Sequence, residues 1–350
     1  MEICPARLEP VFSKRPWGVR SLAPFFPEMS NLAEPVGEAW MTGDECRFAN
    51  GPFVGMKLRD AWSAMPAEWT GTRIDRAAAF PLLVKFIFAA EKLSVQVHPD
   101  DRYASRYEAK AGGRGKTEMW YAVRAEPGAE VLLGMKPEVT FDEFKGAIAD
   151  GTAERCLERV PLSAGEAVFV SAGSAHTIGP GFVLCEVQQQ SDLTYRVFDY
   201  NRRDAQGRPR ELHIEKALEV MRFGKQTCGR LEPARVERDG VSESYFVACK
   251  HFATERWDFG ARARAASSPE HFDVAIVLEG SGTIRWAGKN AEYAPAQVWM
   301  IPAALGEYEF AARERTSLLR TYVPGDLAEL KHTLAARGVA EAALASLLRW

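Results

Sequence analysis

KLSVQVHPDD, residues 92–101, alternates apolar and polar side chains up to a histidine. Successive residues of a β-strand point to opposite faces, so Ser94, Gln96 and His98 share one face and Val95 and Val97 share the other. The segment predicts a strand whose valines enter a core while a hydroxyl, an amide and an imidazole line a cavity. For this segment alone, a surface strand with its polar side chains in water is the alternative.

Strand-length apolar runs lie on both sides of this segment. Bounded by Gly, Pro and Asp, they are FPLLVKFIF (80–88), TEMWYAVRA (117–125), AEVLLGMK (129–136), EAVFVSAG (166–173) and FVLCEVQQQ (182–190). Runs of this length between turn residues are typical of β-strands. A second β region follows from about residue 230 to 323. Many short strands with turn signals predict barrels or sandwiches.

Helical patterns interrupt the strands at a few places. Residues 140–159 have apolar spacing near that of a helix, with Thr140 as N-cap and Glu143 three residues on, which predicts a helical insertion. Residues 213–223 predict a short helix, and 326–350 a closing helix or helical pair. We therefore expect two domains: 1–229, with the insertion near 140–160, and 230–350, with the C-terminal helix.

Two segments, GEAVFVSAGSAH (165–176) and APAQVWMIPAALGE (294–307), share a loose strand–turn pattern. The similarity indicates a duplication in which only the first copy kept its polar side chains. Residues 301–306, the counterpart of the turn before His176, contain no histidine. We therefore expect the second domain to be free of metal and to pack against the first.

Composition and charge exclude several classes of function. The 350 residues are 47% hydrophobic and 26% charged, with a net charge of −3 and both signs interspersed. This composition is ordinary for a globular protein and carries no basic footprint for nucleic acid. No apolar run approaches a membrane span. The six cysteines are scattered without a CxxC pair, and the N-terminus lacks a signal-peptide pattern. We expect a cytoplasmic protein with reduced thiols, a monomer or weak homodimer.

Two histidines fall at turns where the mouth of a barrel would need metal ligands. His98 ends the strand segment quoted above, and His176 follows the turn at 171–174. Glu118 lies on the next plausible strand. With Gln96 these residues would supply two imidazoles, one carboxylate and one amide oxygen. Such a set suits zinc or another first-row divalent ion and leaves positions open for substrate or water.

Residues 165–176 resemble the second cupin motif, with Ser171 where that motif has proline. The first cupin motif usually offers His-x-His and then Glu, whereas this chain has Gln96-x-His98 and then Glu118 after a longer spacer. This departure resembles the type I mannose-6-phosphate isomerases. The similarity extends over most of residues 10–225 through KRPWG (14–18), GEAW (37–40), NGPFVG (50–55), FPLLVKFIFAAEKLSVQVHPDD (80–101), GKTEMWYAV (115–123) and SDLTYRVFDYNR (191–202).

The resemblance implies a mainly β fold of two cupin-like (jelly-roll) β-barrels with a small helical insertion and a C-terminal helix. It implies one divalent metal, with zinc preferred, and a small-molecule sugar phosphate as the partner. The site residues that it implies are the metal ligands Gln96, His98, Glu118 and His176, the active-site arginine Arg196, the lysine Lys116, the acidic residue Glu186 and the cavity-wall serine Ser94.

The implied reaction interconverts mannose 6-phosphate and fructose 6-phosphate through an enediol. Moving a proton between C1 and C2 needs a base and a stabiliser of oxyanion charge. Arg196 offers donors in a planar fork for the enediolate or the phosphate, with an ion pair to Asp199 as the alternative. Lys116 and Glu186 compete for the role of base. Lys136 is a further candidate for binding phosphate.

Two other functions compete with the isomerase. Two histidines and a carboxylate also describe the iron site of cupin oxygenases, although Gln96 as a fourth ligand and Arg196 with Lys116 for an anionic substrate argue against it. A non-catalytic sugar- or metal-binding cupin would keep the ligands without needing Arg196. Turnover of hexose 6-phosphates separates these alternatives. We assign no role to the remaining histidines, His213, His251, His271 and His332.

Overall fold

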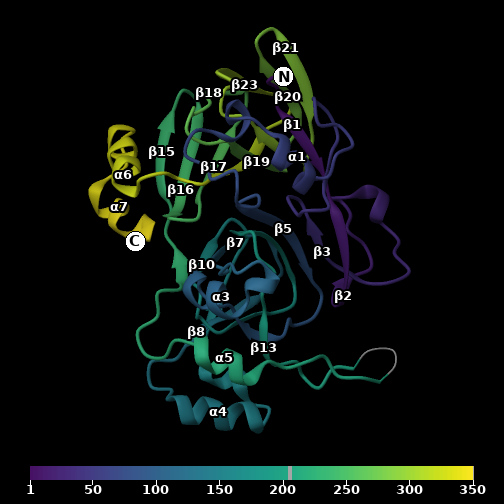
Figure 1. The fold of residues 1–350 in the computed structure, drawn as a ribbon, viewed down its shortest axis with the longest axis vertical. Helices are drawn as coiled ribbons and strands as arrows, with labels where there is room; N and C mark the ends of the chain where they lie inside the picture. The colour runs from purple at the N-terminus through teal and green to yellow at the C-terminus, as the bar shows by residue number, and fades with distance from the viewer. Residues whose placement is uncertain (204–206, 350) are drawn as a thin grey trace.

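The computed structural model describes residues 1–203 and 207–349, and it confirms the mainly β prediction. Figure 1 shows two β units, one above the other, with the first unit in purple to teal and most of the second in green to yellow. Two helices near the C-terminus lie on the outside of the second unit. None of the helices in the described ranges is long and apolar enough to cross a membrane.

The first unit consists of two sheets that face each other. The larger sheet has the order β14 (Gly229–Leu231), β10 (Ala167–Val170), β7 (Glu118–Ala125), β12 (Phe182–Gln189), β5 (Leu82–Ala89), β3 (Val36–Trp40), β2 (Val11–Val19). The smaller sheet has the order β13 (Tyr195–Phe198), β6 (Val95–Val97), β11 (His176–Ile178), β8 (Glu130–Met135), β9 (Leu157–Pro161). Ile87 and Trp120 of the first sheet share a core with Leu133 and Ile178 of the second.

The second unit repeats this arrangement. Its larger sheet has the order β15 (Ala234–Arg238), β16 (Val241–Cys249), β17 (Ala253–Phe259), β24 (Thr316–Tyr322), β19 (Asp273–Glu279), β22 (Val298–Ile301), β1 (Ala6–Glu9), β4 (Arg47–Phe48), and β25 (Leu348–Arg349) pairs with β16. Its smaller sheet has the order β18 (Arg262–Ala266), β23 (Glu307–Ala312), β20 (Gly282–Trp286), β21 (Lys289–Tyr293). The strands of both units thus form paired open sheets of the jelly-roll kind.

Strand order confirms the predicted duplication. The run β2-β3-β5-β12-β7-β10 in the first unit corresponds strand by strand to β15-β16-β17-β24-β19-β22 in the second. The seventh strand of each sheet comes from the part of the chain next to the other unit. β14, which precedes the second unit, pairs with β10 of the first, and the N-terminal β1 pairs with β22 of the second. Figure 1 shows β1, in purple, running into the second unit. The division at residue 229 stays a prediction about independent folding.

The helices fall at the ends and edges of the sheets. The insertion forms α4 (Phe141–Ala149) and η3 (Ala153–Cys156), and the predicted capping box between Thr140 and Glu143 is present at the start of α4. The others are η1 (Pro27–Met29), α1 (Leu58–Ala64), α2 (Ala67–Thr70), α3 (Asp101–Tyr107), η2 (Ala109–Ala111), α5 (Ile214–Val220), α6 (Leu327–Ala336) and α7 (Glu341–Leu347).

Strand β5 is buried on both faces, which explains its nearly continuous apolar sequence. Leu82 and Phe86 join a large core that also contains Phe252 and other residues of the second unit. Ile87 joins the core inside the first unit. Lys85 is the only charged residue of β5 and is itself buried. A lysine in this position needs carboxylate partners, because an unpaired buried charge is costly.

The second unit also has buried charges at the positions that correspond to the inner face of the first. Glu186 on β12 lies opposite Lys85 on β5, and Arg320 on β24 lies opposite Glu255 on β17. Arg320 thus occupies the position of Glu186, and Glu255 that of Lys85. The expectation that only the first copy kept its polar side chains is therefore wrong.

Arg320 stands at the centre of this second cluster. Its Nη1 donates to Glu255 Oε1 at 2.7 Å and its Nε donates to Asp273 Oδ2 at 2.9 Å. Asp273 begins β19 as Glu118 begins β7, so it takes the place of that carboxylate. The guanidinium therefore supplies fixed positive charge between two carboxylates inside the second unit.

Replacing Arg320 with alanine is expected to lower the free energy of unfolding by about 3–5 kcal/mol, because two buried carboxylates lose their partner. Denaturant titration measures the effect. The exposed pair Arg313–Glu292 provides a control. Arg313→Ala should change stability by less than about 1 kcal/mol, as is usual for exposed pairs. Equal effects of the two substitutions would contradict a stabilising role for Arg320.

Candidate functional site

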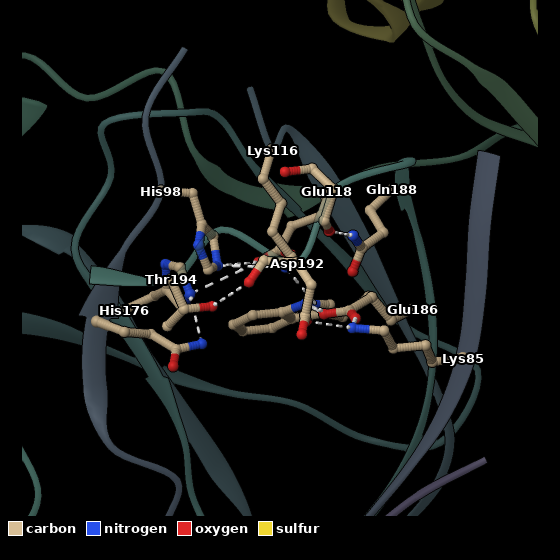
Figure 2. Close-up of polar contacts among 12 residues, drawn as sticks. Lys85, His98, Lys116, Glu118, His176, Glu186, Gln188, Asp192 and Thr194 are labelled. Atoms are coloured by element: carbon tan, nitrogen blue, oxygen red, sulfur yellow. Dashed lines mark hydrogen bonds and ion pairs between the residues drawn. The ribbon is translucent and has the colours of Figure 1, made fainter. Parts of the chain in front are cut away.

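Three strands of the first unit bring the predicted ligands together. His176 on β11 pairs with Gln96 on β6, and Glu118 is the first residue of β7. The predicted alternation of β6 is confirmed, since Val95 and Val97 lie in an apolar core on the other side of the strand. Figure 2 shows His98, His176 and Glu118 converging on one point.

The two histidines are held in the same tautomer by backbone carbonyls. His98 Nδ1 donates to Leu193 O at 2.7 Å, and His176 Nδ1 donates to Ser174 O at 2.9 Å. A carbonyl only accepts, so each Nε2 carries a lone pair. The lone pair of His98 faces Lys116 Nζ at 3.2 Å, and that of His176 faces Gln96 Nε2 at 3.3 Å. These Nε2 atoms lie 3.7 Å and 3.6 Å from Glu118 Oε1. Burial lowers the pKa of His98 well below its usual range and that of His176 to about 4, so both rings are neutral.

The chemistry of this cluster fits a divalent cation. Glu118 Oε1 is fully buried and has no hydrogen-bond partner among the described residues, a costly state that a cation would relieve. Burial raises the pKa of the Glu118 carboxyl to about 8, against the opposing effect of Lys116. Gln96 Nε2 lies 3.3 Å from His176 Nε2, and Ser94 Oγ donates to Gln96 Oε1 at 3.3 Å. A half-turn of the amide would exchange its oxygen and nitrogen and present the oxygen to a metal.

A buried chain of lysines and carboxylates borders the cluster (Figure 2). Lys116 Nζ bonds to Glu118 Oε2 and lies 3.7 Å from Glu186 Oε1. Lys85 Nζ lies 3.5 Å from Glu186 Oε2, and Trp120 Nε1 donates to Glu186 Oε1 at 3.1 Å. Burial alone would raise the pKa of Glu186, but Lys116 and Lys85 lower it to about 2. The Glu186 carboxylate therefore stays ionised and is a weak base.

A polar cavity of about 350 Å³ opens from this cluster to the surface. The exposed fractions of the side chains that line it fall from 32% at Arg15 and 27% at Arg210 to 5% at Glu186 and 4% at Lys116. Glu186 and Lys116 therefore lie at the bottom of the cavity and the two arginines at its mouth. The lining includes Arg15, Trp17, Lys85, Ser94, Gln96, Lys116, Glu186, Asp192, Thr194, Arg196, Arg210 and His213.

Arg196 projects into this cavity from β13. Its Nε donates to Ser94 Oγ at 3.2 Å, which orients the guanidinium. The carboxylate of Asp199 accepts hydrogen bonds from Arg202 and Arg210. The alternative partner considered for Arg196 is thus engaged by two other arginines. Arg196 Nη1 donates to Glu211 O at 3.0 Å, and the rest of the guanidinium faces the cavity.

Lys136 lies outside this arrangement. It follows the end of β8, is half-buried, and is not among the described residues that line the cavity. Its backbone N–H donates to Cys156 O at 2.9 Å, which directs this segment toward the helical insertion. The phosphate role considered for Lys136 therefore has no support from its position.

Several cavity residues were missed by sequence reasoning. Lys85 had a signal, since it is the only charge in an apolar strand pattern. Arg15 comes from a distant segment and Arg210 from the stretch of chain after β13, and no local pattern marks either as a neighbour of Arg196. His213, to which no role was assigned, also lines the cavity, and its Nδ1 accepts a hydrogen bond from the Arg196 backbone N–H at 3.3 Å.

Comparison with known proteins places these residues in a family. Residues 6–128 match the family described as phosphomannose isomerase type I, catalytic domain. The chain is 34% identical over 284 residues to the mannose-6-phosphate isomerase of Streptococcus mutans, covering 80% of this chain and 86% of that protein. The crystal structure of the mannose 6-phosphate isomerase from Bacillus subtilis superimposes with a TM-score of 0.82 at 31% identity, covering 91% and 99% of the two chains.

A more distant structure shares the fold. A mannose 6-phosphate isomerase bound with zinc and yttrium superimposes with a TM-score of 0.70 at 17% identity, covering 92% of this chain and 100% of the other. With relatives above 30% identity over most of their length, this chain is an enzyme that belongs to the type I mannose-6-phosphate isomerase family.

Proposed function

We propose that the enzyme interconverts mannose 6-phosphate and fructose 6-phosphate through an enediol at a single divalent metal site. One observation carries the proposal. Two neutral imidazoles and an unpartnered carboxylate oxygen lie directly beside Lys116 and Gln96, which line the same cavity as Arg196. A volume of about 350 Å³ is within the range of small-molecule sites.

The metal would be held by Gln96, His98, Glu118 and His176. Their mixture of nitrogen and oxygen donors suits zinc, which is also named with the distant relative described above. A bound divalent ion acts as a Lewis acid that polarises carbonyl and hydroxyl oxygens of a substrate. The Nδ1 hydrogen bonds of both histidines fix the rings for this task, as partners of metal-ligating histidines usually do.

The charge distribution orients the sugar phosphate in the cavity. Arg15, Arg196 and Arg210 lie toward the mouth, where their guanidinium groups suit a phosphate dianion. Burial and then Arg210 lower the pKa of Arg196, which indicates that the guanidinium groups are close enough to repel one another. An anion between them relieves this repulsion. The reacting end of the sugar then points to the bottom of the cavity.

Proton transfer is assigned to Lys116. The Lys116 amine, which bonds to Glu118 Oε2 and lines the cavity, would take the proton from one carbon and return it to the neighbouring one. Glu186 is the weaker candidate, because two lysines keep its pKa near 2. Its contacts with Lys85, Lys116 and Trp120 suit a group that positions the lysines. Arg196 remains available to stabilise the enediolate or bind phosphate.

Replacing Arg210 with alanine is expected to raise KM by about 10–100-fold with little change in kcat. This is the effect expected when a substrate phosphate loses one charge-assisted hydrogen bond. Arg202 provides a matched control, because it also bonds to Asp199 but does not line the cavity. Arg202→Ala should leave KM within about 3-fold of wild type. Steady-state kinetics on mannose 6-phosphate measures both. A fall in kcat at constant KM would contradict the phosphate role of Arg210.

A coupled assay on hexose 6-phosphates, with metal content measured in parallel, tests the function itself. Isomerisation of mannose 6-phosphate that is lost on chelation and restored by a divalent ion is expected. Oxygen consumption by an iron-loaded protein would favour the oxygenase. Metal and sugar binding without turnover would favour the non-catalytic cupin.

The cellular setting is part of the same proposal. The six cysteines are free, and burial raises the pKa of the Cys46 thiol to about 12, which makes it unreactive. Free, unreactive thiols support a reducing cytoplasm. We infer a monomer or weak homodimer, which light scattering across a concentration series would test.

A further inference from the structure

The segment that carries Lys116 and Glu118 is anchored by one carboxylate outside the cavity. Asp101 Oδ1 accepts from the Gly115 backbone N–H at 3.0 Å and from Gln189 Nε2 at 2.8 Å. Gln189 Oε1 in turn accepts from the Thr117 backbone N–H at 2.9 Å. Gly115 and Thr117 directly precede Lys116 and Glu118. Asp101 Oδ1 thus holds the backbone of Gly115 directly and that of Thr117 through Gln189.

The anchoring carboxylate belongs to the segment that carries the other ligands. Asp101 follows His98 by three residues, and the backbone N–H of Lys116 donates to Pro99 O at 3.1 Å. Gly115 packs so closely that a Cβ there would lie 2.6 Å from Asp101 N. The two ligand-bearing segments therefore touch backbone to backbone at this point.

The other oxygen of Asp101 faces the second unit. Asp101 Oδ2 lies 3.4 Å from Lys250 Nζ and 3.6 Å from His251 Nε2. Both residues belong to the turn between β16 and β17. One carboxylate thus joins a turn of the second unit to the backbone that presents Glu118.

We propose that Asp101 is a positioning residue through which the second unit holds the Glu118 segment against the His98 segment. The inference rests on the proposed metal centre. Metal ligands bind strongly only when their separation is fixed, and groups behind the ligands that fix them typically change affinity by 10–100-fold. Asp101 acts on the reaction through the position of Lys116 and Glu118, without touching substrate.

Cobalt(II) titration of the full-length apoprotein, followed by absorption, tests the proposal alongside kinetics. Asp101→Ala is expected to weaken cobalt binding by about 10–100-fold and to lower kcat. Asp101→Asn keeps an acceptor at Oδ1 and should recover most of the cobalt affinity. Asp100→Ala is the matched control. Its carboxylate caps α3 by accepting from Tyr103 N, so its loss should affect stability but leave cobalt affinity unchanged.

Two further variants test the separate steps. Gly115→Ala should weaken cobalt binding without altering any charge, because its Cβ would displace the segment. The double variant Lys250→Ala/His251→Ala should weaken cobalt binding by about 2–5-fold, as expected for partly exposed charges.

Wild-type cobalt affinity in the double variant would overturn the link to the second unit. Wild-type cobalt affinity in Asp101→Ala, even with a lower unfolding midpoint, would overturn the positioning role. Cobalt affinity is measured without turnover. A protein that binds cobalt but fails the isomerase assay would therefore contradict the proposed function and leave the test of Asp101 intact.

Discussion

Alanine at His98 or His176 is expected to abolish both metal binding and isomerase activity. Each substitution removes an Nε2 lone pair that faces Glu118 Oε1 within 3.7 Å. Removing a hydrogen-bond partner of a metal ligand typically lowers metal affinity by about 10–100-fold. Removing the ligand itself should therefore lower it by more than about 10²-fold. Elemental analysis of the purified variants and the coupled assay measure the two effects.

The wild-type chain should hold one ion, and an exposed histidine offers a control. His332 lies on the surface of α6, and His332→Ala should keep both metal and activity. Two ions per wild-type chain, or full activity after exhaustive chelation, would contradict the metal centre. Glu118→Gln should weaken metal binding as well, since a neutral amide cannot replace the unpartnered carboxylate oxygen.

The ligand cluster could be predicted from sequence because its information is local. Two-residue alternation places Gln96 and His98 on one face, and the position of His176 after a turn follows from a short motif. In the structure the same residues gather around Glu118 through the pairing of β6 with β11. Residues that depend only on strand periodicity and turn position are thus the ones that sequence locates well.

Features that depend on long-range packing were beyond this reasoning. The pairing of β1 with β22 joins two short strands from distant parts of the chain, and nothing in either strand specifies its partner. The mouth arginines likewise meet only after folding. The Arg320 cluster was missed for a different reason. Its carboxylate partners lie on separate strands, so each charge by itself resembles a surface residue.

Replacing Arg196 with alanine is expected to lower kcat by about 10²–10³-fold, or roughly 3–4 kcal/mol, if its guanidinium stabilises charge that develops in the enediolate. The metal should stay bound, because the Arg196 side chain is linked to the ligand cluster through Ser94 and its backbone pairing with Gln96 is kept in the variant. Arg196→Lys should rescue poorly, since a point charge cannot reproduce a planar fork of donors. The measurements are kcat and KM on mannose 6-phosphate, with metal content determined in parallel.

The pattern of kcat and KM decides which role Arg196 has. Interactions made only in the transition state change kcat, whereas interactions made equally with bound substrate change KM. A rise in KM at constant kcat would make Arg196 a phosphate clamp that acts with Arg210. No change in either would remove it from the reaction altogether. A large loss of kcat could also arise if the Arg196 substitution left Asp199 without a partner. Asp199 is bonded to Arg202 and Arg210 and keeps both when Arg196 is removed, which argues against this structural explanation.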